Sequence, residues 1–359
     1  HDAKASALWR NVAAARRALG NDEGELQALN AAIDADRRDF MAWLRKAELH
    51  QRRDDNGEAL VAWQGVLQLA AQAGDVPAEL ATTLQKGRDF VSSAASKIAQ
   101  VVESEVASLR SNMNESEQRR SAAFVDLAVG RRRAYTNQCD GLFYPFLPAD
   151  EFFDRQHFDW MPSLEAATDD IRTELQALMT DPGDALRPYV QMDKGLPDNK
   201  WSGLDHSLDW GACFLWEYGQ PNQPVLDRCP KTTAALAALP LAGITGRSPN
   251  AFFSLLKPGT RIPPHTGVTN TRAIIHLPLI VPDACGFRVG GETREWRVGE
   301  AFAFDDTIEH EAWNESRELR AVLIFDVWNP HMTQREREFV IRYYGAADAT
   351  GFNPAYAAS

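Results

Sequence analysis

Residues 271–306, TRAIIHLPLIVPDACGFRVGGETREWRVGEAFAFDD, decide the fold class of this 359-residue chain. Short runs of β-branched and aromatic residues alternate there with the turn-forming triplets PDA, GGE and VGE, a pattern typical of successive β-strands. Similar runs occur on both sides, at WGACFLWEYG (210–219), AFFSLLK (251–257) and ELRAVLIFDVW (318–328). Several short strands in one block predict a β-sandwich or jelly roll. TQREREFVIRYY (333–344) predicts a helix after it.

The first part of the chain has a helical pattern instead. Apolar residues recur there at helical spacing, and DEGELQALNAAI (22–33) resembles DNGEALVAWQGV (55–66), 33 residues later. A period of roughly 34 residues is typical of tetratricopeptide helix pairs. We therefore predict an α+β, multidomain chain, with tetratricopeptide-like helices over 1–135 and the β domain over 136–359. Such helices act either as a surface for a protein partner or as a scaffold, and the sequence favours neither.

The segments between these blocks are predicted to be mixed. Residues 111–135 are charged and either helical or loose, and their basic run RRR (131–133) is expected to be a solvated face. SLEAATDDIRTELQALM (163–179) predicts one amphipathic helix with Ser163 as its N-cap.

Composition argues against several classes of protein. The chain has 38 basic and 50 acidic residues and a net charge of −12, whereas a nucleic-acid binder normally presents a basic surface. Its four cysteines form no CxxC pair, which favours a reducing, cytoplasmic compartment over a disulfide framework or zinc knuckle. No apolar run reaches the roughly 18 residues of a membrane span, and no signal peptide is recognisable. Because the chain begins at His1, we expect a trimmed N-terminus.

Two histidines and an arginine form the most specific pattern for function. His265 follows a proline pair and His310 follows FDDTIE, so each is expected where one strand ends and another begins. In a jelly roll such positions can face each other, and imidazole binds iron, zinc or copper. Arg320 begins the strand RAVLIFDVW, where an unpaired guanidinium is costly to bury. If it faces inward, it can bind a carboxylate through two hydrogen bonds, which predicts an iron site with 2-oxoglutarate as co-substrate. The alternative is a structural salt bridge to Asp305, Asp306 or Glu318.

Neighbouring residues complete the predicted site. Ser254, on AFFSLLK, would add a hydroxyl to the carboxylate that Arg320 binds. His276 would either contact the other end of the co-substrate or lie in the core as a satisfied histidine. Arg272 shares a strand face with His276 by alternation and would reach the substrate at the rim. For Asp305 and Asp306 we expect supporting or turn roles rather than metal ligation.

The strings PHTGVTNTRAIIHLPLIVP (264–282), GGETREWRVGEAFAFDDTIEHEAWNES (290–316) and LRAVLIFDVWNP (319–330) resemble the aspartyl/asparaginyl β-hydroxylase family. The likeness runs over residues 252–330. It implies an iron(II)- and 2-oxoglutarate-dependent oxygenase on a double-stranded β-helix. Members of that family bind iron with two histidines and no carboxylate, so Gly267, two residues after the first histidine, is expected. Animal members also carry tetratricopeptide-like helices before the oxygenase domain.

The resemblance also implies a role for each residue of the predicted site. The predicted iron ligands are His265 and His310, the anchors of the 2-oxoglutarate C5 carboxylate are Ser254 and Arg320, the contact to its other end is His276, and the residue that binds the acidic side chain of the substrate is Arg272.

Two departures from the family bear on the substrate. Ile274 stands where eukaryotic members have another arginine, and only Cys229 is present where they have a cysteine pair. The expected activity is β-hydroxylation of Asp or Asn in a peptide or protein. A small-molecule or lipid acyl substrate, as in bacterial members that hydroxylate lipid A, is the alternative, and a hydrophobic channel lined by Phe152, Phe153 and Trp160 would favour it. A non-enzymatic tetratricopeptide adaptor with a vestigial barrel and a cupin-type zinc or manganese enzyme are further alternatives. We expect a bacterial protein.

Overall fold

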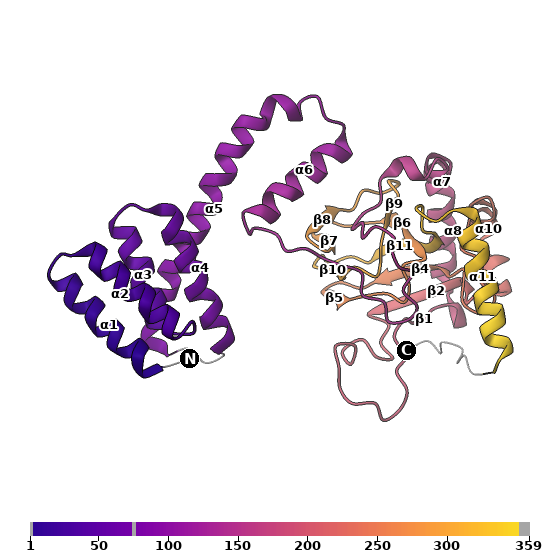
Figure 1. Cartoon of the computed structure of the whole chain (residues 1–359). Coiled ribbons are helices and arrows are strands. Elements are labelled where there is room, and N and C mark those ends of the chain that lie inside the picture. The colour runs from indigo at the N-terminus through magenta and orange to yellow at the C-terminus, as the bar shows by residue number, and fades with distance from the viewer. Residues whose placement is uncertain (1–2, 74–76, 352–359) are drawn as a thin grey trace. The chain divides into compact units, whose positions relative to one another are not determined.

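The structure, a computed structural model, describes residues 3–73 and 77–351 (Figure 1). It divides between Arg132 and Arg133 into two compact units. Among its described residues the first unit contains helices and no strand, whereas the second combines antiparallel sheets with helices. No helix in the described ranges has both the length and the apolar composition needed to cross a bilayer.

Six α-helices lie in the described residues of the first unit, and the predicted helical N-terminal region is confirmed. Asn21, Asp39 and Asn114 cap three of these helices by accepting a backbone N–H, as N-cap residues do. The buried side chains between the helices are mostly Ala, Leu and Trp63. The helices are α1 (Ala3–Ala18), α2 (Asp22–Ala35), α3 (Phe40–Arg52), α4 (Asn56–Ala73), α5 (Ala81–Arg110) and α6 (Glu115–Ala128).

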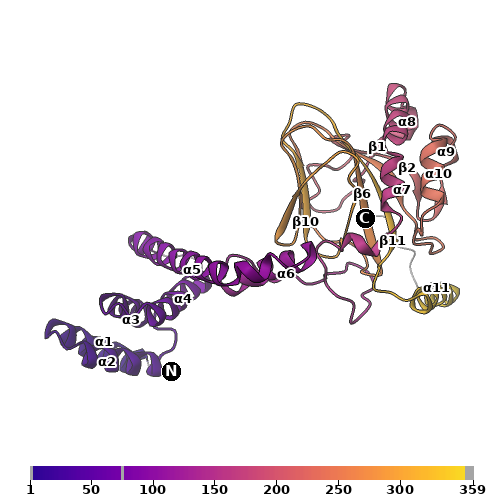
Figure 2. The ribbon, with the colours of Figure 1, turned by 90° about the horizontal axis from the view of Figure 1, so that it is seen from above.

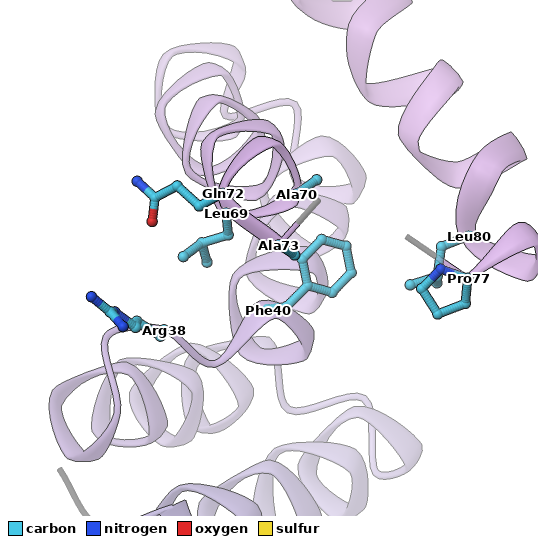
Figure 3. Close-up of a pocket in the computed structure, with 8 residues that line it drawn as sticks. All are labelled: Arg38, Phe40, Leu69, Ala70, Gln72, Ala73, Pro77 and Leu80. Carbon is cyan, nitrogen blue, oxygen red and sulfur yellow. The ribbon is translucent and has the colours of Figure 1, made fainter. Parts of the chain in front are cut away.

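A hollow of about 630 Å³ lies in this unit, between α4 and residues 77–80 (Figure 3). Its lining is largely apolar, with Phe40 and Leu69 on one side and Leu80 on the other. Arg38 is the charged residue among those that line it. The described residues that line the hollow therefore include no set of side chains that could bind a metal or exchange protons.

The single helix predicted over 163–179 is wrong. Two helices, α7 (Met161–Ala166) and α8 (Thr168–Thr180), meet at Ala167. Pro162 stands in the first turn of α7, where proline is preorganised for a helix. The helix therefore begins before Ser163, which lies within it and is not an N-cap.

Two antiparallel sheets form the core of the second unit. Of the eight strands β4 to β11, the first, eighth, third and sixth lie in one sheet, and the second, seventh, fourth and fifth lie in the other. This is the strand order of a jelly roll, so the predicted fold is confirmed. The larger sheet has the order β1 (Arg187–Pro188), β2 (Trp210–Glu217), β4 (Ala251–Leu256), β11 (Arg320–Trp328), β6 (Arg272–Ile280), β9 (Phe302–Phe304), with β3 (Gln220–Pro221) paired to β2; the smaller has the order β5 (Thr260–His265), β10 (His310–Asn314), β7 (Cys285–Val289), β8 (Glu292–Glu295).

Helices cover the outer face of the larger sheet, and its inner face meets the smaller sheet (Figure 2). Because side chains alternate along a strand, Ala273, Ile275 and Leu277 of β6 face the helices. Arg272 and His276 therefore face the space between the sheets. The covering helices include α7, α8, α9 (Gln223–Leu226) and α10 (Pro230–Ala237). The chain continues into α11 (Gln334–Ala349), so the helix predicted over 333–344 is confirmed, and Thr333 and Glu336 form a capping box at its start.

Candidate active site

His265 and His310 meet at one end of the smaller sheet. β5 ends at the first and β10 begins at the second, and the two residues are partners in the antiparallel register. Their ring centroids lie 4.0 Å apart. Nδ1 of His265 lies 2.8 Å from the carbonyl oxygen of Pro263, and Nδ1 of His310 lies 3.0 Å from that of Ile308. We therefore assign the ring hydrogen of each to Nδ1, which leaves a lone pair on Nε2 for a metal.

Both imidazoles are neutral near physiological pH. Burial lowers the pKa of His265 to about 4. Burial, with the neighbouring His265 ring, lowers the pKa of His310 well below its ordinary value. In residues 3–73 and 77–351 no group of three or more His, Cys, Asp or Glu side chains is arranged to hold a metal ion. The pair fits a metal that takes two nitrogen ligands from the protein and the rest from bound molecules.

The Asp306 carboxyl occupies the space beside Gly267. A Cβ at position 267 would meet Oδ2 of Asp306 at 2.1 Å, far inside contact distance. Burial raises the pKa of Asp306 to about 7, although Arg272 opposes the shift. Oδ1 of Asp306 is buried without a hydrogen-bond partner. A carboxyl group is therefore present near the histidines, but it comes from the turn before His310.

Asp305, in contrast, has the turn role predicted from the sequence. Its Oδ1 accepts hydrogen bonds from the backbone N–H of Thr307 at 3.0 Å and from the Thr307 hydroxyl at 2.6 Å. Its Oδ2 accepts from Asn137 at 2.7 Å. Burial raises its pKa to about 6 despite these donors. The carboxyl group of Asp305 therefore shapes the turn that leads to His310.

Arg320 is a buried cation without an acidic partner. Its side chain is 2% exposed, and its Nη1 donates a hydrogen bond to Oγ of Ser254 at 3.3 Å. No carboxylate of the described residues forms an ion pair with it, so the alternative of a structural salt bridge is not observed. Burial lowers its pKa to about 10. A guanidinium held this way fits an anionic guest.

His276 lies between Arg320 and the rim of the barrel. Its ring packs against Phe287 and Phe304, with centroid distances of 4.9 Å to each. Burial and the charge of Arg320 lower its pKa well below the ordinary value. Its Nδ1 is buried without a hydrogen-bond partner, so it is not the satisfied core histidine of the alternative interpretation.

The strand register orders these groups along the barrel. Arg272 opens β6, and His276 follows four residues later, about 13 Å further along at roughly 3.3 Å per residue. Ile280, at the far end of β6, pairs with Ala321, which is next to Arg320. The order from the rim inward is therefore Arg272, His276 and Arg320.

Arg272 is already paired. Its Nη1 donates to Oδ2 of Asp326 at 2.6 Å. Asp326 also accepts from the backbone N–H of Asn250 at 3.1 Å and from its side chain at 3.3 Å. Burial alone would lower the pKa of Arg272, but the Asp326 and Asp306 carboxylates raise it. Its Nε is buried without a partner, so one donor remains for a ligand at the rim.

Three residues near the site were not singled out from the sequence. The Trp201 ring lies edge-on to His265 with centroids 5.0 Å apart, and Nε1 of Trp210 donates to Oγ of Ser254 at 3.1 Å. Neither tryptophan stands in a distinctive pattern. Asp326 was detectable, because an acidic residue in the apolar strand RAVLIFDVW needs a buried partner.

Phe152, Phe153 and Trp160, which would favour a lipid substrate if they lined a channel, do not line one together. Phe152 is buried between the sheets, where its ring centroid lies 5.7 Å from that of Phe302. Phe153 is buried in the other core, under the helices, and Trp160 packs there as well. The side chains of Phe152 and Phe153 point in opposite directions into two separate cores, so the two residues do not line one channel.

The fold and site define a jelly-roll domain with a two-histidine centre, and sequence comparison places it in a family. Residues 165–330 match the model of the aspartyl/asparaginyl beta-hydroxylase family. The resemblance to this hydroxylase family is confirmed over that region. Aspartyl/asparaginyl beta-hydroxylase of Mus musculus is 38% identical over 152 residues, which cover 41% of this chain and 20% of that protein.

Other relatives differ in the substrates that their names give. The ornithine lipid ester-linked acyl 2-hydroxylase of Rhizobium tropici is 32% identical over 192 residues, 53% of this chain and 64% of that protein. Aspartate beta-hydroxylase domain-containing protein 2 of Rattus norvegicus is 31% identical over 201 residues, 55% of this chain and 56% of that protein. The matched region thus spans less than two thirds of each relative.

Among solved structures, a cupin 2 conserved barrel domain protein from Salinispora arenicola overlaps with 44% of this chain and 99% of that chain. Its TM-score is 0.24 at 10% identity. The strand order, rather than this overlap, defines the jelly roll.

Proposed function

We propose that this chain is an iron(II)- and 2-oxoglutarate-dependent hydroxylase. One observation carries the proposal: two neutral histidines, His265 and His310, with ring centroids 4.0 Å apart, share a barrel with Arg320, a buried cation that no acid neutralises. A metal between the imidazoles and a dicarboxylate that reaches the guanidinium would satisfy both features together.

Each residue has a defined task in this proposal. His265 and His310 hold the metal through Nε2, because Nδ1 of each is occupied by a backbone carbonyl. Arg320 and Ser254 hold the distal carboxylate of 2-oxoglutarate, and His276 lies between that carboxylate and the metal. When bound, iron(II) and 2-oxoglutarate would supply the electrons that activate dioxygen for hydroxylation, a chemistry that amino-acid side chains lack.

The preferred substrate is an Asp or Asn side chain of a peptide or protein. Nε of Arg272 is a buried donor without a partner at the rim, and Oδ1 of Asp306 is a buried oxygen without one. A side-chain carboxylate or amide can use the donor, and an amide N–H can use the acceptor. Both groups lie on the rim side of His276, where a substrate would approach the metal.

A lipid acyl or small-molecule substrate is the second candidate. It is favoured by the 32% identity to an ornithine lipid acyl 2-hydroxylase and by Ile274, which adds apolar surface between Arg272 and His276. A panel of acidic peptides and acyl lipids separates the two substrate classes, because only the correct class accelerates 2-oxoglutarate consumption.

The first unit is proposed to be tetratricopeptide-like. α2 begins at Asp22 and α4 at Asn56, a separation close to the repeat length of roughly 34 residues, and consecutive helices from α1 to α4 pack against one another. Such helices can present a surface to a protein partner. A purely adaptor function for the whole chain would give no reason for the neutral histidines or the unneutralised arginine.

The direct test is conversion of 2-oxoglutarate to succinate by purified protein with iron(II), with and without the substrate panel. His310→Ala is expected to abolish turnover and to lower the stoichiometry of bound metal, because it removes one of two protein ligands. His206→Ala removes an exposed histidine and is expected to leave both unchanged. Wild-type protein that neither binds 2-oxoglutarate nor forms succinate with any substrate would refute the proposal.

A further inference from the structure

Trp296 lies directly after β8, in contact with the residues that anchor the proposed co-substrate. Its ring is nearly parallel to that of His276, with an interplanar angle of 9° and centroids 5.4 Å apart. The guanidinium carbon of Arg320 lies 5.1 Å from the centre of the indole. The side chain is 8% exposed. Trp296 therefore joins two residues of the site that come from different strands.

Several polar groups around this indole are buried without a hydrogen-bond partner. They are Nε1 of Trp296, Nε of Arg320 and Nδ1 of His276. Buried tryptophan N–H groups usually have a partner, and buried donors in general are rarely left unpaired. Trp296 contacts both of the other side chains, and the unpaired N–H donors of Trp296 and Arg320 indicate a shared guest that carries acceptors.

The hydroxyl of Ser254 adds a fourth group. Its oxygen accepts a hydrogen bond from Nε1 of Trp210 at 3.1 Å and one from Nη1 of Arg320 at 3.3 Å. A hydroxyl oxygen has two lone pairs and one hydrogen. Because both lone pairs are in use, the remaining capacity of Ser254 is to donate its hydrogen. The hydroxyl therefore also fits a guest that accepts hydrogen bonds.

We propose that Trp296 is a further residue of the 2-oxoglutarate pocket, and that its indole N–H donates a hydrogen bond to the distal carboxylate beside Arg320 and Ser254. This inference rests on the proposed function. The indole N–H can only donate, as can the guanidinium. A carboxylate offers about four lone-pair sites, so it can accept from the guanidinium, the hydroxyl and the indole together.

The charge distribution indicates why the distal carboxylate, rather than the keto-acid end, is the partner. Arg320 is the cation in contact with the indole, and no carboxylate of the described residues neutralises it. The keto-acid end would lie toward His265 and His310, whose rings hold the proposed metal. His276 separates the two ends, because it stacks on Trp296 on one side and packs against Phe304, which in turn contacts His310 at 5.2 Å.

Trp296→Phe tests the hydrogen bond, because it keeps an aromatic ring against His276 and Arg320 and removes the N–H. We would measure dissociation constants by calorimetry on the full chain loaded with manganese(II), for 2-oxoglutarate and for 2-oxopentanoate, which lacks the distal carboxylate. The variant is expected to bind 2-oxoglutarate about 10- to 100-fold more weakly, as for loss of a hydrogen bond to a charged group, and to bind 2-oxopentanoate like the wild type. Trp313→Phe, at an indole that stacks with Arg261, is the matched control and is expected to change neither constant.

Unchanged affinity of Trp296→Phe for 2-oxoglutarate, or an equal loss for both ligands, would overturn the proposal, since the second result indicates a purely structural role. A failure of the wild type to bind 2-oxoglutarate would overturn the proposed function itself. If the variant does not fold, NMR spectra of the indole N–H groups of the wild type decide whether Trp296 contacts the co-substrate. 2-Oxoglutarate, but not 2-oxopentanoate, should then shift a resonance that persists in Trp210→Phe, and absence of that shift would refute the contact.

Discussion

Replacement of Arg320 by methionine should make the ligand-free protein more stable than the wild type. With the co-substrate bound, the variant should be less stable than the wild type. One pKa unit corresponds to about 1.4 kcal/mol. Burial lowers the Arg320 pKa from its ordinary value to about 10, so it destabilises the charged folded form by about 3 kcal/mol. This cost is present at every pH below about 10 and fades as the pH rises through that value, because only the deprotonated guanidinium avoids it.

Methionine keeps the apolar length of the side chain and removes the charge. It also removes the contact to Ser254 and the cation–π contact to Trp296, which together contribute about 2 kcal/mol. The net effect on the ligand-free protein is a stabilisation of about 1 kcal/mol. For a domain of this size that raises the midpoint of thermal unfolding by about 2–4 °C.

With 2-oxoglutarate the order of stability should reverse. A ligand at 100 times its dissociation constant stabilises the wild type by about 2.7 kcal/mol, whereas Arg320→Met should bind at least about 30-fold more weakly because a carboxylate loses its charged partner. Calorimetric melting with and without 2-oxoglutarate measures both effects. Arg261→Met removes an exposed arginine that pairs with Glu311 and Glu315 and serves as control, with little expected change. A ligand-free Arg320→Met protein that melts several degrees lower, yet binds 2-oxoglutarate normally, would refute the reasoning.

Two further substitutions test close packing at glycines. Gly267→Asp should reduce metal binding and turnover rather than restore a third ligand, because even its Cβ would meet Oδ2 of Asp306 at 2.1 Å. Calorimetric metal titration of this variant, and of the double variant with Asp306→Gly, measures the effect. Normal metal binding by the single variant would contradict the prediction. Gly87→Ala should lower the free energy of unfolding of the first unit, measured by urea denaturation, by about 1–3 kcal/mol through overpacking, since its Cβ would lie 2.4 Å from Trp63. Gly57→Ala, with no atom within 4 Å of its Cβ, should be neutral or stabilising; equal midpoints for the two variants would refute the packing argument.

The strands and the direction of their side chains could be predicted because alternation is local. In TRAIIHLPLIV the small and aliphatic residues Ala273 and Ile275 pack under helices, and the intervening Arg272 and His276 are left to face the other sheet. The same rule places Arg320 inside the barrel. The two histidines were placed at strand ends from flanking prolines and turn residues, and the register confirms that they are partners.

Contacts that depend on distant parts of the chain could not be predicted. Trp210 and Ser254 are 44 residues apart in sequence, and Arg272 and Asp326 are 54 apart. Neither pair has a local pattern, because each forms only when separate strands align. The break between α7 and α8 was missed for the opposite reason, because Ala167 lies within a strongly helical run. Only the position of Pro162 indicates the earlier helix start.

The two buried arginines of the barrel differ in one respect that bears on specificity. Arg272 is neutralised by Asp326 at 2.6 Å, so its charge is satisfied when no substrate is bound at the rim. Acidic, amide or apolar substrates could therefore bind there at small electrostatic cost. Arg320 has no acidic partner among the residues that the structure describes, so a bound anion would satisfy its charge. We infer that the co-substrate is fixed by the unpaired cation, whereas the choice of substrate is left to residues such as Ile274. Relatives whose names give aspartyl/asparaginyl beta-hydroxylation and ornithine lipid acyl 2-hydroxylation differ in substrate, as such a division would predict.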